Sequence, residues 1–292
     1  MKGPRVAGGL QIPAWLTVLA MLLIGPSACV STPRTMESTA AREYSYLELY
    51  RLYTLAHAAW RVQDRFRETD WELAYFVDED TNTIGFTTED IDDGVLHIVF
   101  RGTSSDAGAV DRQYNFRIHQ RRPSWHPEYS PVRVHRGFLS RYERLRDTVY
   151  RRVAESSADK IVFTGHSAGG VLSLLAFIDI GLSFPDIAIE LVTFGAPRAL
   201  NPAGARWVRR IIHERPGPTR KSRFVHGNDL VPHLPPAILG YRHVTEATHF
   251  GPRPRWYILS ATDHYPGYRD TLRRLVAEQG VDFEALPFSD GP

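Results

Sequence analysis

The residues most able to do chemistry are a serine and its neighbours at positions 165–169, which read Gly-His-Ser-Ala-Gly. They directly follow an apolar run at 160–164, typical of a buried strand, and precede a segment of helical character at 169–180. A serine on such a strand-to-helix turn exposes its hydroxyl, and the helix N-terminus favours developing negative charge. The pattern predicts Ser167 as a nucleophile, the alternative being an ordinary serine in a structural turn. His166 is expected to pack inside the turn.

A serine hydroxyl needs a general base, which a third group orients. In enzymes with this type of turn, the acid and then the histidine follow the serine along the chain. Asp229 comes shortly after a predicted strand at 223–225, on a loop stiffened by prolines. We therefore predict Asp229 as the acid, with an exposed loop aspartate as the alternative.

Four histidines follow Asp229: His233, His243, His249 and His264. His233 lies only four residues beyond Asp229, His243 lies in a predicted strand, and His249 is expected in a hairpin turn. His264 follows the last predicted strand and precedes the last predicted helix, where a triad base belongs. We predict His264 as the base and keep His243 in reserve.

Acyl transfer places negative charge on a carbonyl oxygen, which preorganised N–H and O–H donors stabilise. The backbone N–H of Ala168, directly after the serine, is the expected first donor. Thr103 follows a predicted strand at 95–100 and could offer both an N–H and a hydroxyl. Thr103 and Ala168 are therefore the candidate oxyanion hole, unless residues 101–104 form only a solvated turn.

Strands alternate with helices along the part of the chain that must position these residues. Strands are expected at 71–77, 84–87, 95–100, 160–164, 189–194, 223–225, 241–244 and 256–259, and helices at 44–67, 137–156, 169–180, 201–213 and 269–279. Residues 103–132 are expected to be a loop, and Asn201 and Pro202 are expected to begin their helix. This alternation predicts an α/β fold with a central, mostly parallel sheet and helices on both faces, in a single domain at 44–292.

The 292 residues carry a formal net charge of +2 and one cysteine. The small net charge gives no case for a nucleic-acid partner, and a single cysteine excludes an intrachain disulfide or a cysteine-based zinc site. Residues 1–28 contain two basic residues, a short apolar run and small residues before Cys29, which is the pattern of an export signal. The pattern resembles a bacterial lipoprotein signal, although Pro26 stands where that family prefers leucine.

The expectation is therefore an exported protein held at a membrane surface of the cell envelope by a lipid on Cys29, with residues 29–43 as a polar tether. Ordinary cleavage near Ala28, which would release a secreted protein, and an uncleaved anchor are the alternatives.

Several motifs occur together, in one order, over about residues 70–275. They are Val-Phe-Arg-Gly-Thr (99–103), Val-His-Arg-Gly-Phe (134–138), Thr-Gly-His-Ser-Ala-Gly-Gly (164–170), Thr-Phe-Gly-Ala-Pro-Arg (193–198), Asn-Asp-Leu-Val-Pro-His-Leu-Pro-Pro (228–236) and Asp-His-Tyr (263–265). In these motifs the chain resembles the class 3, or fungal-type, lipase family. The resemblance implies an α/β-hydrolase fold and a serine-dependent hydrolase of carboxylic esters of lipids, with no cofactor and no metal. It assigns the roles already given to Ser167, Asp229, His264, Thr103 and Ala168, and a structural role to His135.

The chain departs from the family at two places. Ala168 replaces the leucine usual after the nucleophile, and Asp111 is followed by Arg112 where the family often has tryptophan and a short amphipathic lid. The expected lid, 104–131, carries Arg112, Arg117, Arg121 and Arg122. A lid this charged favours soluble esters or anionic phospholipid headgroups over oil. A phospholipase, a lipid acyltransferase and a non-catalytic lipid-binding surface lipoprotein are the rival functions.

Overall fold

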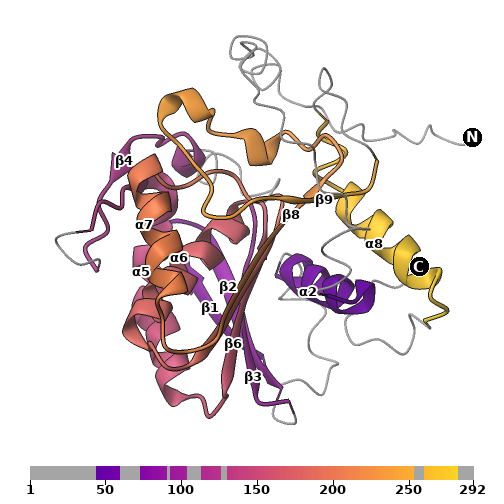
Figure 1. The fold of residues 1–292 in the computed structure, drawn as a ribbon, viewed down its shortest axis with the longest axis horizontal. Coiled ribbons are helices and arrows are strands. Elements are labelled where there is room, and N and C mark those ends of the chain that lie inside the picture. The colour runs from indigo at the N-terminus through magenta and orange to yellow at the C-terminus, as the bar shows by residue number, and fades with distance from the viewer. Residues whose placement is uncertain are drawn as a thin grey trace, which may run out of the picture. The chain divides into compact units, whose positions relative to one another are not determined.

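The computed structural model describes residues 44–59, 73–90, 93–103, 113–125, 130–252 and 260–281. All of them belong to one compact unit, Arg34–Pro292. A seven-stranded sheet in the order β1-β2-β3-β6-β7-β8-β9 forms its centre (Figure 1). The strands are β1 (Leu73–Asp78), β2 (Thr83–Asp90), β3 (Val95–Phe100), β6 (Lys160–His166), β7 (Ala188–Phe194), β8 (Thr219–His226) and β9 (Thr248–Phe250). The first three strands pair antiparallel and the pairs from β3 onward are parallel.

Helices cover both faces of this sheet. Figure 1 shows α5 (Arg136–Glu155), α6 (Ala168–Ser183) and α7 (Pro202–His213) on one face, and α2 (Tyr46–Ala58) and α8 (Gly267–Ala277) on the other. The expected mostly parallel sheet with two covered faces is confirmed. Helices α5, α6 and α7 lie in the connections between successive parallel strands, whereas α2 precedes β1 and α8 follows β9.

The central strands are apolar on both faces because side chains alternate along a strand and both faces are buried. Ile98 and Phe163 belong to the core beneath α5, α6 and α7. Their neighbours Val99 and Val162 belong to the second core, which includes residues of α2 and α8. The apolar runs that predicted buried strands thus supply two cores at once.

Local signals at helix ends match the structure. Asn201 caps α7 by accepting a hydrogen bond from the Gly204 N–H, with Pro202 in the first turn. Helix α6 is apolar almost all round, because it lies between the sheet, α5 and α7. Among the described residues, no helix has both the length and the apolar character that crossing a membrane requires.

Some expected elements are wrong. Residues 241–244 form no strand, since Arg242 makes only an isolated bridge to Leu200. His249 lies in β9, parallel to β8, and not in a hairpin turn. The segment at 103–132 contains a short strand, β4 (Gln120–Arg121), which pairs with β5 (Val134–His135). In each case tertiary contacts decide the backbone, which local sequence patterns do not report.

Two expectations reach beyond the described residues. The first helix is observed over Tyr46–Ala58, and the rest of its predicted range up to residue 67 lies outside them, apart from Ala59. The predicted strand at 256–259 also lies outside the described residues.

Candidate active site

Ser167 occupies the turn between β6 and α6. Its backbone is in the left-handed region, with φ 58° and ψ −128°, a strained conformation that is typical of nucleophilic serines on such turns. A Cβ on Gly165 would lie 2.4 Å from the Gly169 carbonyl carbon, and a Cβ on Gly169 would lie 2.1 Å from the Phe100 oxygen. Glycine at both positions therefore lets α6 begin directly against β6 and the end of β3.

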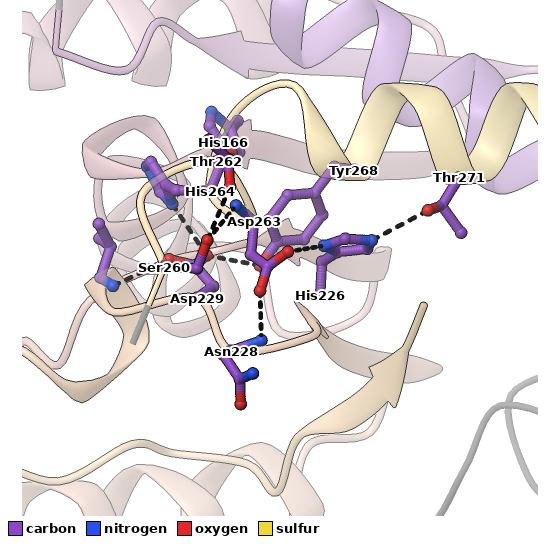
Figure 2. Close-up of polar contacts among 11 residues, drawn as sticks. His166, His226, Asn228, Asp229, Ser260, Thr262, Asp263, His264, Tyr268 and Thr271 are labelled. Carbon is purple, nitrogen blue, oxygen red and sulfur yellow. Dashed lines mark hydrogen bonds and ion pairs between the residues drawn. The ribbon is translucent and has the colours of Figure 1, made fainter. Parts of the chain in front are cut away.

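Asp229 and His264 lie together beyond the end of β8. His264 Nδ1 is 2.8 Å from Asp229 Oδ2, and Asp229 is fully buried (Figure 2). Because a carboxylate only accepts hydrogen bonds, Nδ1 carries the proton, and Nε2 of the neutral ring is left as an acceptor. This is the tautomer that can take a proton from a serine hydroxyl.

Two further residues, which the sequence reasoning missed, hold this pair. The Tyr268 hydroxyl donates to Asp229 Oδ2 over 2.8 Å, and the Val231 N–H donates to Oδ1 over 2.9 Å. Burial and the Asp229 charge raise the pKa of Tyr268 well above its ordinary value, so the phenol remains a donor. In the sequence, the only signal for Tyr268 is that it lies four residues after His264, and this signal requires His264 to be assigned first.

Gly195 is the third missed residue, although it lies in one of the quoted motifs. Its φ of +61° favours glycine, and a Cβ there would lie 2.9 Å from Asp229 Oδ2 and 3.0 Å from His264 Cε1. The carboxylate–imidazole pair therefore rests directly on the backbone that follows β7.

The two oxyanion candidates lie at the same edge of the sheet. Thr103 comes three residues after β3, and Ala168 is the first residue of α6. Gly169 abuts the carbonyl groups of Phe100 and Arg101, so the start of α6 touches the segment that leads to Thr103. Asn115 Nδ2 donates to Thr103 Oγ1 over 3.0 Å and orients that hydroxyl, a contact that the sequence did not indicate.

Three other histidines have structural partners. His243, the reserve base, is half-buried with its Nε2 2.8 Å from the Pro232 carbonyl oxygen, and desolvation lowers its pKa well below the ordinary value. His166 is fully buried, its ring centroid lies 4.5 Å from that of His264, and its Nε2 donates to the His264 carbonyl oxygen over 3.0 Å. His135 caps α5 by accepting from the Gly137 N–H at Nδ1, in keeping with a structural role. Among the described histidines, only His264 forms a hydrogen bond or ion pair with the Asp229 carboxylate.

The described part of the expected lid carries apolar as well as charged side chains. Arg121 pairs with Glu143, and the Arg117 guanidinium lies over the Tyr114 ring. Phe116 and Ile118 are nevertheless 49% and 42% exposed. Residues 104–112 and 126–129 lie outside the described residues, as does Cys29. Within the described ranges, no group of three or more His, Cys, Asp or Glu side chains could hold a metal ion.

Comparison with known proteins gives consistent matches. Residues 97–239 match the family model described as lipase (class 3). A lipase of Rhizopus niveus is 34% identical over 174 residues, which are 56% of this chain and 40% of that protein. A secreted mono- and diacylglycerol lipase of Malassezia globosa is 30% identical over 159 residues, 52% of this chain and 49% of that protein. The chain thus aligns with less than half the length of these curated relatives.

Solved structures agree on the fold. A solved triacylglycerol lipase, described as having a serine protease triad as its catalytic centre, matches with a TM-score of 0.56 and 25% identity. The match covers 71% of this chain and 81% of that one. Residues 97–239 accordingly match the class 3 lipases, and the described chain has the α/β-hydrolase fold of the fungal lipases.

Proposed function

We propose that this protein hydrolyses carboxylic esters of lipids through an acyl-enzyme on Ser167, as a lipase or carboxylesterase. The observation that carries the proposal is the 2.8 Å contact between His264 Nδ1 and buried Asp229, in a chain that also holds Ser167 in a left-handed strand-to-helix turn. The relatives named as lipases support the same chemistry.

The proposed reaction has two halves, formation of the acyl-enzyme and its hydrolysis, and the same residues act in both. His264 Nε2 takes the proton from Ser167 Oγ as Oγ bonds to the ester carbonyl carbon, and the Thr103 and Ala168 donors stabilise the resulting oxyanion. The imidazolium then gives its proton to the departing alcohol oxygen as the C–O bond breaks. In the second half His264 takes a proton from water as the water oxygen bonds to the acyl carbon, and it then gives that proton to Ser167 Oγ as the bond between Oγ and the acyl carbon breaks. Asp229 accepts the His264 Nδ1 proton in a hydrogen bond and orients the ring in both halves.

A fluorophosphonate probe and one variant test this proposal. The wild-type protein is expected to be labelled on Ser167, and Ser167→Ala is expected to lose nearly all ester hydrolysis while keeping its melting temperature. Turnover of Ser167→Ala at the wild-type rate, or an unlabelled but folded wild-type protein, would contradict the proposal. Product analysis with an added alcohol separates hydrolysis from acyl transfer, because a transferase forms the new ester.

Substrate class needs a separate measurement. Esters of graded chain length, offered below and above their solubility limit, together with phospholipid vesicles, test whether the charged lid selects soluble or anionic substrates. The exposed Phe116 and Ile118 beside the lid arginines favour a lipid-like substrate over a small polar ester.

We also propose that residues 1–28 direct export, that Cys29 carries a lipid anchor at the membrane surface, and that residues 29–43 are a tether to the domain at 44–292. The signal-like sequence supports export, as does a relative named as secreted. Metabolic labelling with a fatty acid analogue tests the anchor, because label on the wild-type protein should be absent from Cys29→Ala. Export of an unlabelled wild-type protein would instead indicate ordinary cleavage.

A further inference from the structure

A second carboxylate–imidazole pair lies beside the first, and the two pairs are built reciprocally. The end of β8 supplies His226 and the turn after it supplies Asp229, while the loop before α8 supplies Asp263 and His264. Asp229 contacts His264, while Asp263 Oδ1 lies 3.6 Å from His226 Nδ1 (Figure 2). Each segment thus offers one acid and one imidazole to the other.

Asp263 bonds more tightly to the backbone than to His226. Its Oδ2 accepts the Asn228 N–H over 2.8 Å, and the Asn228 carbonyl oxygen accepts the Ser260 N–H over 2.9 Å. The backbone N–H and carbonyl oxygen of Asn228, next to Asp229, therefore both bind the loop that carries His264. The distance between Asp229 and His264 depends on this attachment, because the Asn228 backbone leads directly into Asp229.

Glycines shape the space around the second pair. Gly227 has φ +46°, and a Cβ there would lie 2.8 Å from Asp263 Oδ2. A Cβ on Gly251 or Gly267 would lie 2.4 Å or 2.6 Å from the His226 ring. His226 is almost fully buried, and its Nε2 lies 2.9 Å from Thr271 Oγ1 in α8. The side chains of Asp263 and His226 therefore fill a site with little room for another arrangement.

The loop transmits this attachment to His264 over a short path. The Asp263 N–H donates to Ser260 Oγ, and the His264 N–H donates to the Ala261 carbonyl oxygen. The backbone carbonyl oxygen of His264 accepts a hydrogen bond from His166, the residue before Ser167. A shift of Asp263 would therefore move His264 relative to both Asp229 and the nucleophile.

We propose that Asp263 is a positioning residue for the proposed base His264, acting by clamping the loop to the Asn228 backbone, with His226 as the packed support of that clamp. The inference rests on the proposed function. Asp263 has a geometric role: the position of His264 depends on the acceptor oxygen and the length of the Asp263 side chain, and not on its charge.

Two substitutions separate geometry from charge. Asp263→Asn keeps an acceptor for the Asn228 N–H at the same reach and offers its amide nitrogen to His226 Nδ1, but has no charge. Asp263→Glu keeps the charge but is one methylene too long for the space above Gly227. We expect Asp263→Asn to retain kcat within about threefold, and Asp263→Glu and Asp263→Ala to lose about 10- to 100-fold in kcat with KM nearly unchanged, the penalty of a displaced catalytic group.

Asp270→Ala is the matched control, because Asp270 is an exposed aspartate in the first turn of α8, directly after the loop that carries Asp263, and forms an ion pair with its neighbour Arg269. It should leave kcat and KM unchanged. If Asp263→Ala does not fold, the Asn and Glu variants decide the question, because both keep an oxygen that can accept from Asn228. Equal loss in Asp263→Asn and Asp263→Ala, or full activity in Asp263→Glu, would overturn the proposal.

A readout without substrate separates this inference from the proposed function. The downfield proton resonance of His264 Nδ1–H, identified by its loss in His264→Gln, should be sharp in the wild-type protein and in Asp263→Asn, and broadened or shifted in Asp263→Glu. An unchanged resonance in Asp263→Glu would refute the positioning role. An inactive, unlabelled wild-type protein with a normal resonance would refute only the ester hydrolase.

Discussion

Replacing Asp229 by asparagine tests the proposed triad with almost no change in volume. The buried carboxylate accepts three hydrogen bonds: from His264 Nδ1 and the Tyr268 hydroxyl at Oδ2, and from the Val231 N–H at Oδ1. Asparagine has one oxygen and one NH₂ group. At least one of these three neighbours must therefore change its role.

The two possible orientations of the amide differ in what the neighbours can do. With its oxygen toward His264 and Tyr268, the amide would direct its NH₂ at the Val231 backbone N–H, which cannot become an acceptor. With its oxygen toward Val231, the NH₂ faces a phenol that can rotate and an imidazole that can shift its proton to Nε2. A buried donor without a partner costs about 1–3 kcal/mol, so the second orientation is favoured.

That orientation places the His264 proton on Nε2, where the ring can no longer accept the serine proton. We expect kcat of Asp229→Asn to fall about 10⁴-fold, roughly 5.5 kcal/mol of barrier, as the same tautomer change does in a Ser-His-Asp protease. The assay is kcat on a soluble short-chain ester, with circular dichroism to establish that the variant is folded. Folded Asp229→Asn with kcat within tenfold of the wild type would refute the hydrogen-bond accounting.

Three further predictions follow from other contacts. Tyr268→Phe removes one hydrogen bond to a charged group, so the free energy of unfolding should fall by about 1.5–3 kcal/mol while kcat falls less than tenfold. Urea denaturation and steady-state kinetics measure these two effects, and an unchanged stability would contradict the prediction. Gly169→Ala places a Cβ 2.1 Å from a backbone oxygen and should lower the free energy of unfolding by at least about 1–3 kcal/mol. The control Gly181→Ala places its Cβ next to the end of a side chain and should lower it by less. Equal stability of the two variants would contradict the packing argument. Burial lowers the pKa of His135 to about 4, so the unfolded state binds more protons than the folded state between about pH 6.5 and pH 4. Stability should therefore fall as the pH drops through that window. His135→Asn, which can still cap α5, should show a weaker pH dependence of the melting temperature in thermal melts.

The fold could be predicted from sequence where the signal is local and continuous. The buried strands at 95–100, 160–166 and 188–194 are apolar runs between helical segments, and their alternation predicts a parallel sheet. Asn201 followed by Pro202 marks a helix start whatever the tertiary contacts. These features depend on backbone preferences within a few residues.

The failures lie where distant contacts decide. Residues 241–244 read as a strand, yet Tyr241 is buried against the lid segment and its hydroxyl donates to the Ile118 carbonyl oxygen. His249 pairs in β9 with a strand more than twenty residues earlier in the chain. A β-like pattern indicates only an extended, half-buried segment, and its partner is set by the rest of the fold.

The candidate site divides in the same way. Ser167 could be assigned because glycines two residues away on each side report the turn, and those glycines are required by backbone approach. Tyr268, Asn115 and Asp263 could not, because each acts on a residue at least twelve positions away along the chain, and a single sequence does not show which distant residues meet.

This division has a consequence for how the site responds to substitution. Ser167 is held by backbone groups: its N–H donates to the Phe194 carbonyl oxygen, and the glycines beside it pack against other backbone. Substitutions of Gly165 or Gly169 must move β6, β3 or α6, so they should damage folding before they reveal any effect on catalysis. His264 is held through the side chains of Asp229, His166 and, by our proposal, Asp263. Substitutions on that side can therefore lower kcat while the sheet and its two cores stay intact, which makes it the half of the site where positioning can be measured apart from folding.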